Sequence, residues 1–395
     1  MSAAGGAGRT AVFLIVGIIV GLIIGYFVGY STVPPAPPTT ITQTVERTVT
    51  QTVGAATTVT VTQPVTFTVT TTGPQPVKEI KLALFVVDFG HPYFKGMAAG
   101  AQRAVEYFQK IGLPVTMDVF DAKNDPATQV AQIETAIGKK YTVLLVNPIT
   151  YEAAEPAMRK AKDANIPMFT LDRDVSDKTL RIAFVGTDNV AAAEVEARYF
   201  LKMIEARGYS KPWKIVILNG LPGASSAEER KKGFHNVLDP LVQKGEVEIV
   251  YEDYADFRSD TAYSKMQSVL ARTRDIHGVI AANDEMILGA IKALRDAGLK
   301  PCEQVVTFGF DAISAAVEAV KEGTLCGTIG QAAFLQGYWG VLAAVYHVLY
   351  GWTPPTDWIK TPVVPVMKEN IDWFGYVIST PISLPVIPIE PYTAY

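Results

Sequence analysis

The stretch LALFVVDFGHPYF, residues 82–94, joins a continuous apolar run to a loop of polar and aromatic residues. Four further apolar runs end in polar side chains, at residues 166–174 (IPMFTLDRD), 278–284 (GVIAAND), 305–311 (VVTFGFD) and 326–331 (CGTIGQ). A short apolar run without alternation is typical of a parallel strand that is buried on both faces. The carboxyl ends of parallel strands open onto one crevice, where ligands bind. We therefore expect the polar ends of all these runs to meet.

Expected strands and helices alternate in two series from residue 78 onward. The first series has expected strands at 80–87, 115–120, 143–146, 168–171 and 182–185, and expected helices at 92–110, 126–138 and 152–164. The second has expected strands at 214–218, 248–251, 278–281, 305–310 and 327–329, and expected helices at 227–238, 259–271, 286–297 and 313–320. Two such series predict an α/β fold of two doubly wound parallel-sheet lobes with the crevice between them.

Residues 11–30 (AVFLIVGIIVGLIIGYFVGY) form an uncharged apolar run about long enough to cross a bilayer. We interpret it as a retained, single-pass membrane anchor, with residues 1–10 in the cytoplasm and the rest of the chain outside. A cleaved secretory signal is the alternative. Glycines recur every fourth residue in this run and would allow a helix-mediated dimer, although glycine is also simply common in membrane helices.

Residues 31–77 change character, with a Pro-rich start followed by repeats of Thr and Val such as TVTVTQPVTFTVTTT. The alternation also fits a strand, but there is little to bury, so we expect these residues not to fold on their own and to form an extended stalk outside the cell. At about 3.3 Å per residue such a stalk could reach well over 100 Å. Residues 376–395 form a Pro-rich, apolar C-terminal tail to which no role is assigned.

The composition excludes several classes of partner and chemistry. A net charge of −4 without a basic stripe argues against nucleic-acid binding. The two cysteines, Cys302 and Cys326, have neither CxxC spacing nor a His cluster nearby, so no metal site is expected, and without a cofactor motif no cofactor is expected either. These cysteines precede two expected neighbouring strands, and the sequence leaves open whether they form a disulfide.

The side chains at the strand ends suit a neutral, polyhydroxylated ligand. The carboxylates of Asp172 and Asp311 accept hydrogen bonds, the guanidinium of Arg173 donates them, and the carboxamides of Asn283 and Gln331 do both. Aromatic rings can cover the apolar CH faces of a sugar ring. This set of groups predicts a sugar site.

The chain contains, in this order, the strings IPMFTLDRD, SSAEERKKGF (225–234), YADF (254–257), AANDEMILGAIKALRDAG (281–298), TFGFD and GTIGQ. In these strings, their order and their spacing, the chain resembles the ribose/allose-type periplasmic sugar-binding proteins, which are type I solute-binding proteins of ABC importers. The resemblance runs from about residue 78 to about residue 367. It implies that the sugar contacts are His91, Tyr93, Phe94, Asp172, Arg173, Arg230, Phe257, Asn283, Asp311 and Gln331.

The same resemblance implies lobe boundaries, partners and local departures. Lobe 1 would comprise residues 78–187 and 332–360, and lobe 2 residues 188–331 and 361–375, joined by a three-strand hinge. The protein would bind a mono- or small saccharide, act with ABC permease subunits, and have a monomeric globular part. His91 stands where the family commonly has Asn, so one end of the sugar would be recognised differently. At the start of the helix after residue 282, we expect Asp284 to be the cap and Asn283 the ligand.

Three other functions use similar residues or the same fold. Paired carboxylates near an arginine could act on a sugar as an enzyme, but the chain has no nucleophile pattern or cofactor motif, and we expect no catalysis. A sugar-sensing receptor ectodomain would need a cytoplasmic signalling domain, for which only residues 1–10 remain. A sugar-responsive transcription factor would carry a DNA-binding domain where this chain has the apolar run.

Overall fold

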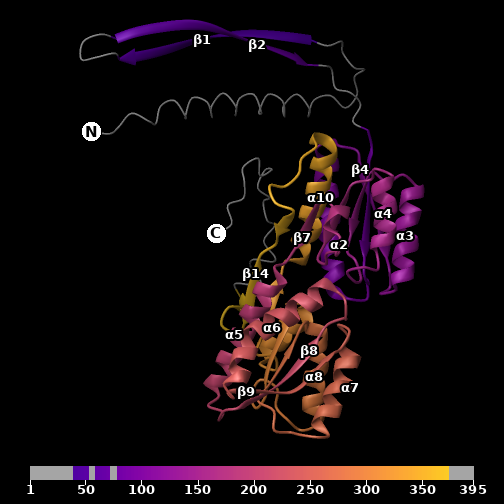
Figure 1. Ribbon diagram of the computed structural model, residues 1–395, viewed down its shortest axis with the longest axis vertical. Helices are drawn as coiled ribbons and strands as arrows, with labels where there is room; N and C mark the ends of the chain where they lie inside the picture. Colours follow the sequence, from indigo (N-terminus) through magenta and orange to yellow (C-terminus); the bar gives the residue numbers. More distant parts are fainter. Residues whose placement is uncertain (1–38, 53–57, 72–77, 373–395) are drawn as a thin grey trace. The chain divides into compact units, whose positions relative to one another are not determined.

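The computed structural model describes residues 39–52, 58–71 and 78–372 of the 395-residue chain (Figure 1). The predicted membrane span at residues 11–30 and the tail at 376–395 lie outside these described residues. Within the described ranges, no helix combines the length and apolar character that crossing a bilayer requires.

Two strands of 14 residues each, β1 (Thr39–Thr52) and β2 (Thr58–Thr71), pair as an antiparallel two-stranded sheet. The register is unbroken from the pair of Thr39 with Thr71 onward. The expectation that these residues do not fold on their own is therefore wrong for the two strands, whereas their role as a stalk outside the cell stays a prediction. Alternating Thr and Val favours strands, and pairing satisfies backbone groups that a lone strand leaves to water. Because the chain turns back, each strand reaches only about 48 Å.

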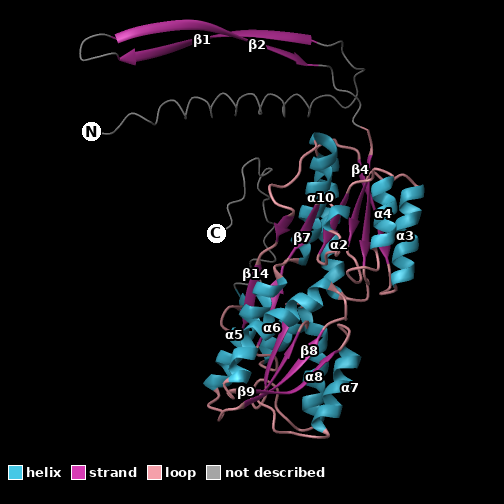
Figure 2. Ribbon diagram, viewed as in Figure 1, coloured by secondary structure: helices cyan, strands magenta, loops and turns pink. Residues whose placement is uncertain are grey.

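The first of two six-stranded sheets has the order β13-β7-β6-β5-β3-β4, and all its neighbouring strands are parallel. Its strands are β3 (Ile80–Val86), β4 (Val115–Asp121), β5 (Val143–Val146), β6 (Met168–Leu171), β7 (Ala183–Gly186) and β13 (Trp358–Lys360). Its helices are α2 (Pro92–Lys110), α3 (Pro126–Gly138), α4 (Glu155–Asp163), the short η1 (Lys178–Leu180) and α10 (Ala333–Tyr350). Helices cover both faces of this sheet, as Figure 2 shows, which explains why the central strands β5, β6 and β7 are buried along their whole length.

The second sheet has the order β14-β12-β11-β10-β8-β9, in which only β14 is antiparallel to its neighbour. Its strands are β8 (Trp213–Asn219), β9 (Val247–Tyr254), β10 (Gly278–Ala281), β11 (Val306–Asp311), β12 (Gly327–Gln331) and β14 (Val363–Met367). Its helices are α5 (Asn189–Ala206), α6 (Ser225–Gln243), α7 (Ser259–Leu270), α8 (Asp284–Asp296) and α9 (Ser314–Glu322). Helices α5 and α6 pack together, and α7 packs with α8.

Each sheet with its helices is one lobe, and the predicted class of two α/β parallel-sheet lobes is confirmed. We call them the first lobe and the second lobe in chain order. The chain passes from one to the other after β7, between β12 and α10, and between β13 and β14, because α5 packs on β10–β12 and α10 packs on β5–β7. The core of the second lobe includes Cys302 and Cys326 at its edge, and they form a disulfide.

Helix α2, whose first turn carries the predicted site residues Tyr93 and Phe94, lies unusually close to α10. A Cβ atom on Gly100 of α2 would lie 1.9 Å from the carbonyl oxygen of Phe334, and one on Gly337 of α10 would lie 1.9 Å from that of Met97. Only glycine permits this backbone contact, which fixes α2 against the helix that follows the second passage between the lobes.

Candidate functional site

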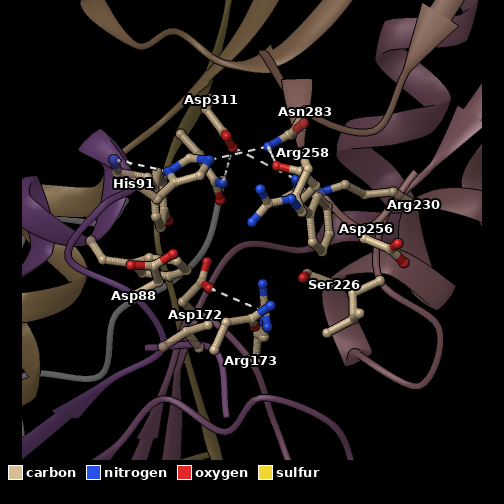
Figure 3. A pocket seen from close by; sticks show the side chains of 17 residues that line it. Asp88, His91, Asp172, Arg173, Ser226, Arg230, Asp256, Arg258, Asn283 and Asp311 are labelled. Atoms are coloured by element: carbon tan, nitrogen blue, oxygen red, sulfur yellow. Dashed lines mark hydrogen bonds and ion pairs between the residues drawn. The ribbon is translucent and has the colours of Figure 1, made fainter. Parts of the chain in front are cut away.

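All ten residues selected from the sequence line one pocket of about 550 Å³, its opening included. Figure 3 shows that the two lobes face each other across this pocket, with Asp172 and Arg173 on one side and Asn283 and Asp311 on the other. The ten residues are His91, Tyr93, Phe94, Asp172, Arg173, Arg230, Phe257, Asn283, Asp311 and Gln331. The structure thus brings every one of them together, while their contact with a ligand stays a prediction.

The first lobe contributes the residues that follow β3 and β6. Asp172 directly follows β6 and has a positive φ of 60°, a conformation that non-glycine residues rarely adopt and that recurs at functional sites. The side-chain nitrogen of Asn147 donates to Asp172 Oδ2 over 3.2 Å. Burial raises the pKa of the Asp172 carboxyl, although Arg173 and Arg230 oppose this by stabilising its charge.

Arg173 is held between two aromatic rings that come from different lobes. The centre of its guanidinium lies 5.7 Å from the ring centroid of Phe94 and 5.1 Å from that of Phe257. Its Nη1 donates to the carbonyl oxygen of Ile149 over 2.9 Å, whereas its buried Nε finds no hydrogen-bond acceptor among the described residues. Burial lowers the pKa of Arg173 to about 10, so the side chain stays charged at neutral pH. A charged donor is therefore available in the pocket.

The second lobe fixes a second arginine, Arg230, from α6. Its Nε donates to Asn189 Oδ1 over 3.0 Å and its Nη1 donates to the carbonyl oxygen of Ala282 over 2.7 Å. The guanidinium centre lies 3.8 Å above the ring of Phe310. With these contacts the direction of the remaining N–H groups is set before any ligand binds.

Asp311 ends β11 with a φ of 120°, which is strained for any residue except glycine. Its Oδ1 accepts a hydrogen bond from Gln331 Nε2 over 2.6 Å and lies 3.6 Å from Nη1 of Arg230. Burial raises the pKa of this carboxyl to about 7, even though Arg230 and the Gln331 hydrogen bond favour the charged form. Asp311 is thus an acceptor whose charge changes near neutral pH.

The start of α8 corrects one prediction. Asn283, not Asp284, is the N-cap, because its Oδ1 accepts from the backbone N–H of Met286 over 3.0 Å. Asp284 is fully buried instead, where its Oδ2 accepts from the N–H of Ile313 and its Oδ1 from the hydroxyl of Thr328. Its carboxylate therefore joins the ends of three neighbouring segments of the second lobe. The Nδ2 of Asn283 remains directed at the pocket.

The loop at residues 220–226 lines the pocket through Leu221 and Ser226. Ring packing explains Gly220, since a Cβ there would lie 2.2 Å from the ring of Phe257. Sequence reasoning did not select several other lining residues, namely Val87, Asp88, Asn124, Asp256 and Arg258. Asn124 and Asp256 follow strand ends just as the selected residues do, so the same signal could have found them.

Comparison with known proteins agrees with this fold and arrangement. A family model described as a periplasmic binding protein domain matches residues 82–351. The ribose import binding protein RbsB of Bacillus subtilis is 30% identical over 260 residues, which cover 66% of this chain and 79% of that protein. RbsB of Escherichia coli is 31% identical over 250 residues, covering 63% and 78%. An Agrobacterium vitis ABC transporter solute binding protein with bound D-fucose superposes with a TM-score of 0.66 at 29% identity, covering 74% and 97%.

The chain therefore belongs to the periplasmic binding protein family, and its relatives are sugar-binding solute-binding proteins of ABC transporters. The resemblance deduced from the sequence motifs is confirmed. The relatives are binding proteins rather than enzymes, and the family is one of extracytoplasmic proteins.

Proposed function

We propose that this protein captures one small neutral saccharide in the pocket between its lobes and delivers it to the permease of an ABC importer. The observation that carries the proposal is the convergence of ten residues, remote in sequence, on one pocket of two carboxylates, two guanidiniums, two carboxamides and several rings. Opposite charges offset one another within this set. A neutral ligand with many hydroxyl groups can satisfy both kinds of group without adding charge.

The contacts support recognition of a sugar in particular. Asp172 and Asp311 can accept from ligand hydroxyls, and the Nε of Arg173 can donate to a ligand oxygen, each charged hydrogen bond contributing about 1.5–3 kcal/mol. The rings of Phe94 and Phe257 line the same pocket, one from each lobe, and can cover apolar CH groups of a sugar. Ribose is named for two relatives and D-fucose for a structural neighbour, so pentoses and hexoses are the first candidates.

Closure of the two lobes on the ligand is part of the proposal. We propose the lobe boundaries stated in the sequence analysis, with a hinge at the three passages near Asp188, after Gln331 and near Thr361; the order of strands in the two sheets supports this. Three short passages allow bending and resist sliding. Because the ligand-facing residues are divided between the lobes, a sugar gains all its contacts only when the lobes meet, and it therefore favours closure.

We further propose that the protein works outside the cytoplasm as a single-pass membrane protein, anchored by residues 11–30. The Cys302–Cys326 disulfide supports an extracytoplasmic location, since such bonds persist in oxidising compartments. The globular part is proposed to be a monomer, with dimerisation possible only through the anchor helix. The permease subunits of the importer are the proposed protein partners.

A thermal-shift screen of the full chain against pentoses, hexoses and inositols tests the proposal. A sugar present at about 100 times its Kd should add about 2.7 kcal/mol of stability. Each stabilising sugar is then incubated with the protein and recovered for chromatography. We expect stabilisation and unchanged sugar. Stabilisation with conversion of the sugar would indicate an enzyme, and no stabilisation by any sugar would contradict the proposal.

A further inference from the structure

His91 acts as the N-cap of α2 through its ring. The backbone N–H of Tyr93, in the first turn of α2, donates to His91 Nδ1 over 3.2 Å. Helix N-caps are usually Ser, Thr, Asp or Asn, whose side-chain oxygen accepts this hydrogen bond. The Nδ1 of His91 takes the place of that oxygen, and the longer side chain carries Nε2 farther into the pocket.

Asn283 has the equivalent position at the start of α8 in the other lobe. Its Oδ1 is used by the cap to Met286, so the orientation of its carboxamide is fixed and Nδ2 is the atom that faces the pocket. Figure 3 shows His91 and Asn283 pointing toward one another. The two nitrogens, His91 Nε2 and Asn283 Nδ2, are 3.2 Å apart.

The contact between His91 and Asn283 lacks one hydrogen-bond acceptor. A neutral imidazole has one N–H and one acceptor nitrogen, yet two donors approach the ring, the N–H of Tyr93 and the Nδ2 of Asn283. If Nδ1 accepts from Tyr93, then Nε2 carries the proton and two N–H groups face each other. Among the described residues, the oxygen to which Asn283 Nδ2 donates is the Phe257 carbonyl, over a long 3.5 Å. A protonated ring would have no acceptor at all.

The surroundings favour the neutral ring. Burial, together with the nearby charges of Arg173 and Arg230, lowers the pKa of His91 to about 4. Two helices also begin at this point, α2 in the first lobe and α8 in the second, and their dipoles favour an electron-rich atom there. An oxygen placed between the two nitrogens could accept from both.

We propose that His91 and Asn283 together donate to one ligand oxygen, and so select a saccharide that presents an oxygen able to accept two hydrogen bonds where α2 and α8 begin. This oxygen is either the ring ether oxygen or a hydroxyl whose own proton points elsewhere. The inference rests on the proposed function and adds a specificity role for His91.

The tautomer of His91 tests the inference without any ligand. The full chain, labelled with ¹⁵N-histidine in detergent, has four histidines, and a His91→Asn variant assigns the signal. At pH 7 we expect His91 to be neutral with its proton on Nε2. A proton on Nδ1, or a doubly protonated ring at this pH, would refute the inference even if sugars bind.

An Asn283→Asp variant tests the donor pair with ligands. It keeps the shape and the cap oxygen but replaces the Nδ2 donor with an acceptor. Asn165→Asp, at an exposed turn, adds the same charge away from the pocket and is the control. Titrations use D-ribose, D-fucose, D-allose, carbocyclic ribose with CH₂ in place of the ring oxygen, and myo-inositol.

For each sugar that binds the wild type, we expect Asn283→Asp to weaken binding at least about tenfold and Asn165→Asp to leave it unchanged. If the ring oxygen is the acceptor, the affinity for carbocyclic ribose does not change in Asn283→Asp. If a hydroxyl oxygen is the acceptor, the affinities for D-ribose and carbocyclic ribose fall by the same factor. Less than a twofold change for every ligand would overturn the inference. Failure of all five ligands to bind the wild type would count against the proposed function, whereas the tautomer is measured independently.

Discussion

Replacement of Asp311 by Asn keeps the shape of the side chain and removes its charge and one acceptor oxygen. The wild-type carboxylate is buried, receives a 2.6 Å hydrogen bond from Gln331 and lies 3.6 Å from Arg230. Loss of this negative charge removes charged hydrogen bonds to ligand hydroxyls, and it leaves the positive charge of Arg230 less fully neutralised. At about 1.5–3 kcal/mol for such a bond, we expect binding to weaken by about 2–4 kcal/mol. This corresponds to an increase in Kd of roughly 30- to 1,000-fold.

The pH dependence of the same variant provides a second measure. With a pKa of about 7, roughly 90% of Asp311 is ionised at pH 8 and roughly 10% at pH 6. If the ionised form accepts the ligand hydroxyl, the wild-type Kd should be about tenfold larger at pH 6 than at pH 8. The Kd of Asp311→Asn should not change over this range.

Stability should respond to pH in the opposite sense. The folded-state pKa of Asp311 lies above the unfolded value of 3.8, so the folded protein holds the extra proton between these values. Its contribution to stability is full below about pH 4 and is lost as the pH rises through 7.

Isothermal titration calorimetry at pH 6, 7 and 8 on wild type, Asp311→Asn and the control Asp163→Asn, at an exposed site away from the pocket, measures the expected rise in Kd and its expected dependence on pH. Thermal unfolding of each protein shows whether the fold is retained. A change of less than about threefold in Kd for Asp311→Asn, together with a wild-type Kd that does not vary with pH, would refute the reasoning.

Four further predictions concern stability, location and motion. Replacing Cys302 and Cys326 by Ser should lower the free energy of unfolding by about 3 kcal/mol in urea denaturation, because the disulfide closes a loop with a sequence separation of 24; an unchanged midpoint would contradict this. Gly337→Ala should lower the unfolding free energy by about 1–3 kcal/mol, whereas Gly138→Ala, which meets nothing within 4 Å, should not destabilise; equal effects would contradict the close helix contact. The protein should stay in the membrane fraction after a high-salt wash, and a mature N-terminus after residue 30 would overturn the anchor. Small-angle scattering should show a smaller radius of gyration with a saturating sugar; an unchanged radius despite tight binding would contradict hinge closure.

The parts of the fold that the sequence predicted well are those with a local signal. Apolar runs that end in polar residues, as at Asp172 and Asp311, predicted the central strands and brought together residues distant in sequence. Helices α5 and α10 were not predicted. The sequence of α10 is apolar on most of its faces, so it lacks the polar face that would mark an amphipathic helix.

The errors arose where a choice depends on neighbours distant in sequence. The pairing of β1 with β2 requires a partner strand, and composition alone does not state whether one is present. Asn283 and Asp284 are both good N-caps by residue type. Asn283 is the N-cap because its backbone is extended (φ −159°, ψ 168°). Asp284 is not, because its carboxylate accepts from the N–H of Ile313 and the hydroxyl of Thr328, which are distant in sequence.

A crystal structure grown with the tightest-binding monosaccharide of the screen would test the central claim most directly. We predict that the sugar lies in the pocket and contacts Asp172 and Arg173 of the first lobe together with Asp311 of the second. A sugar bound elsewhere on the protein, or in contact with only one lobe, would contradict the proposed site.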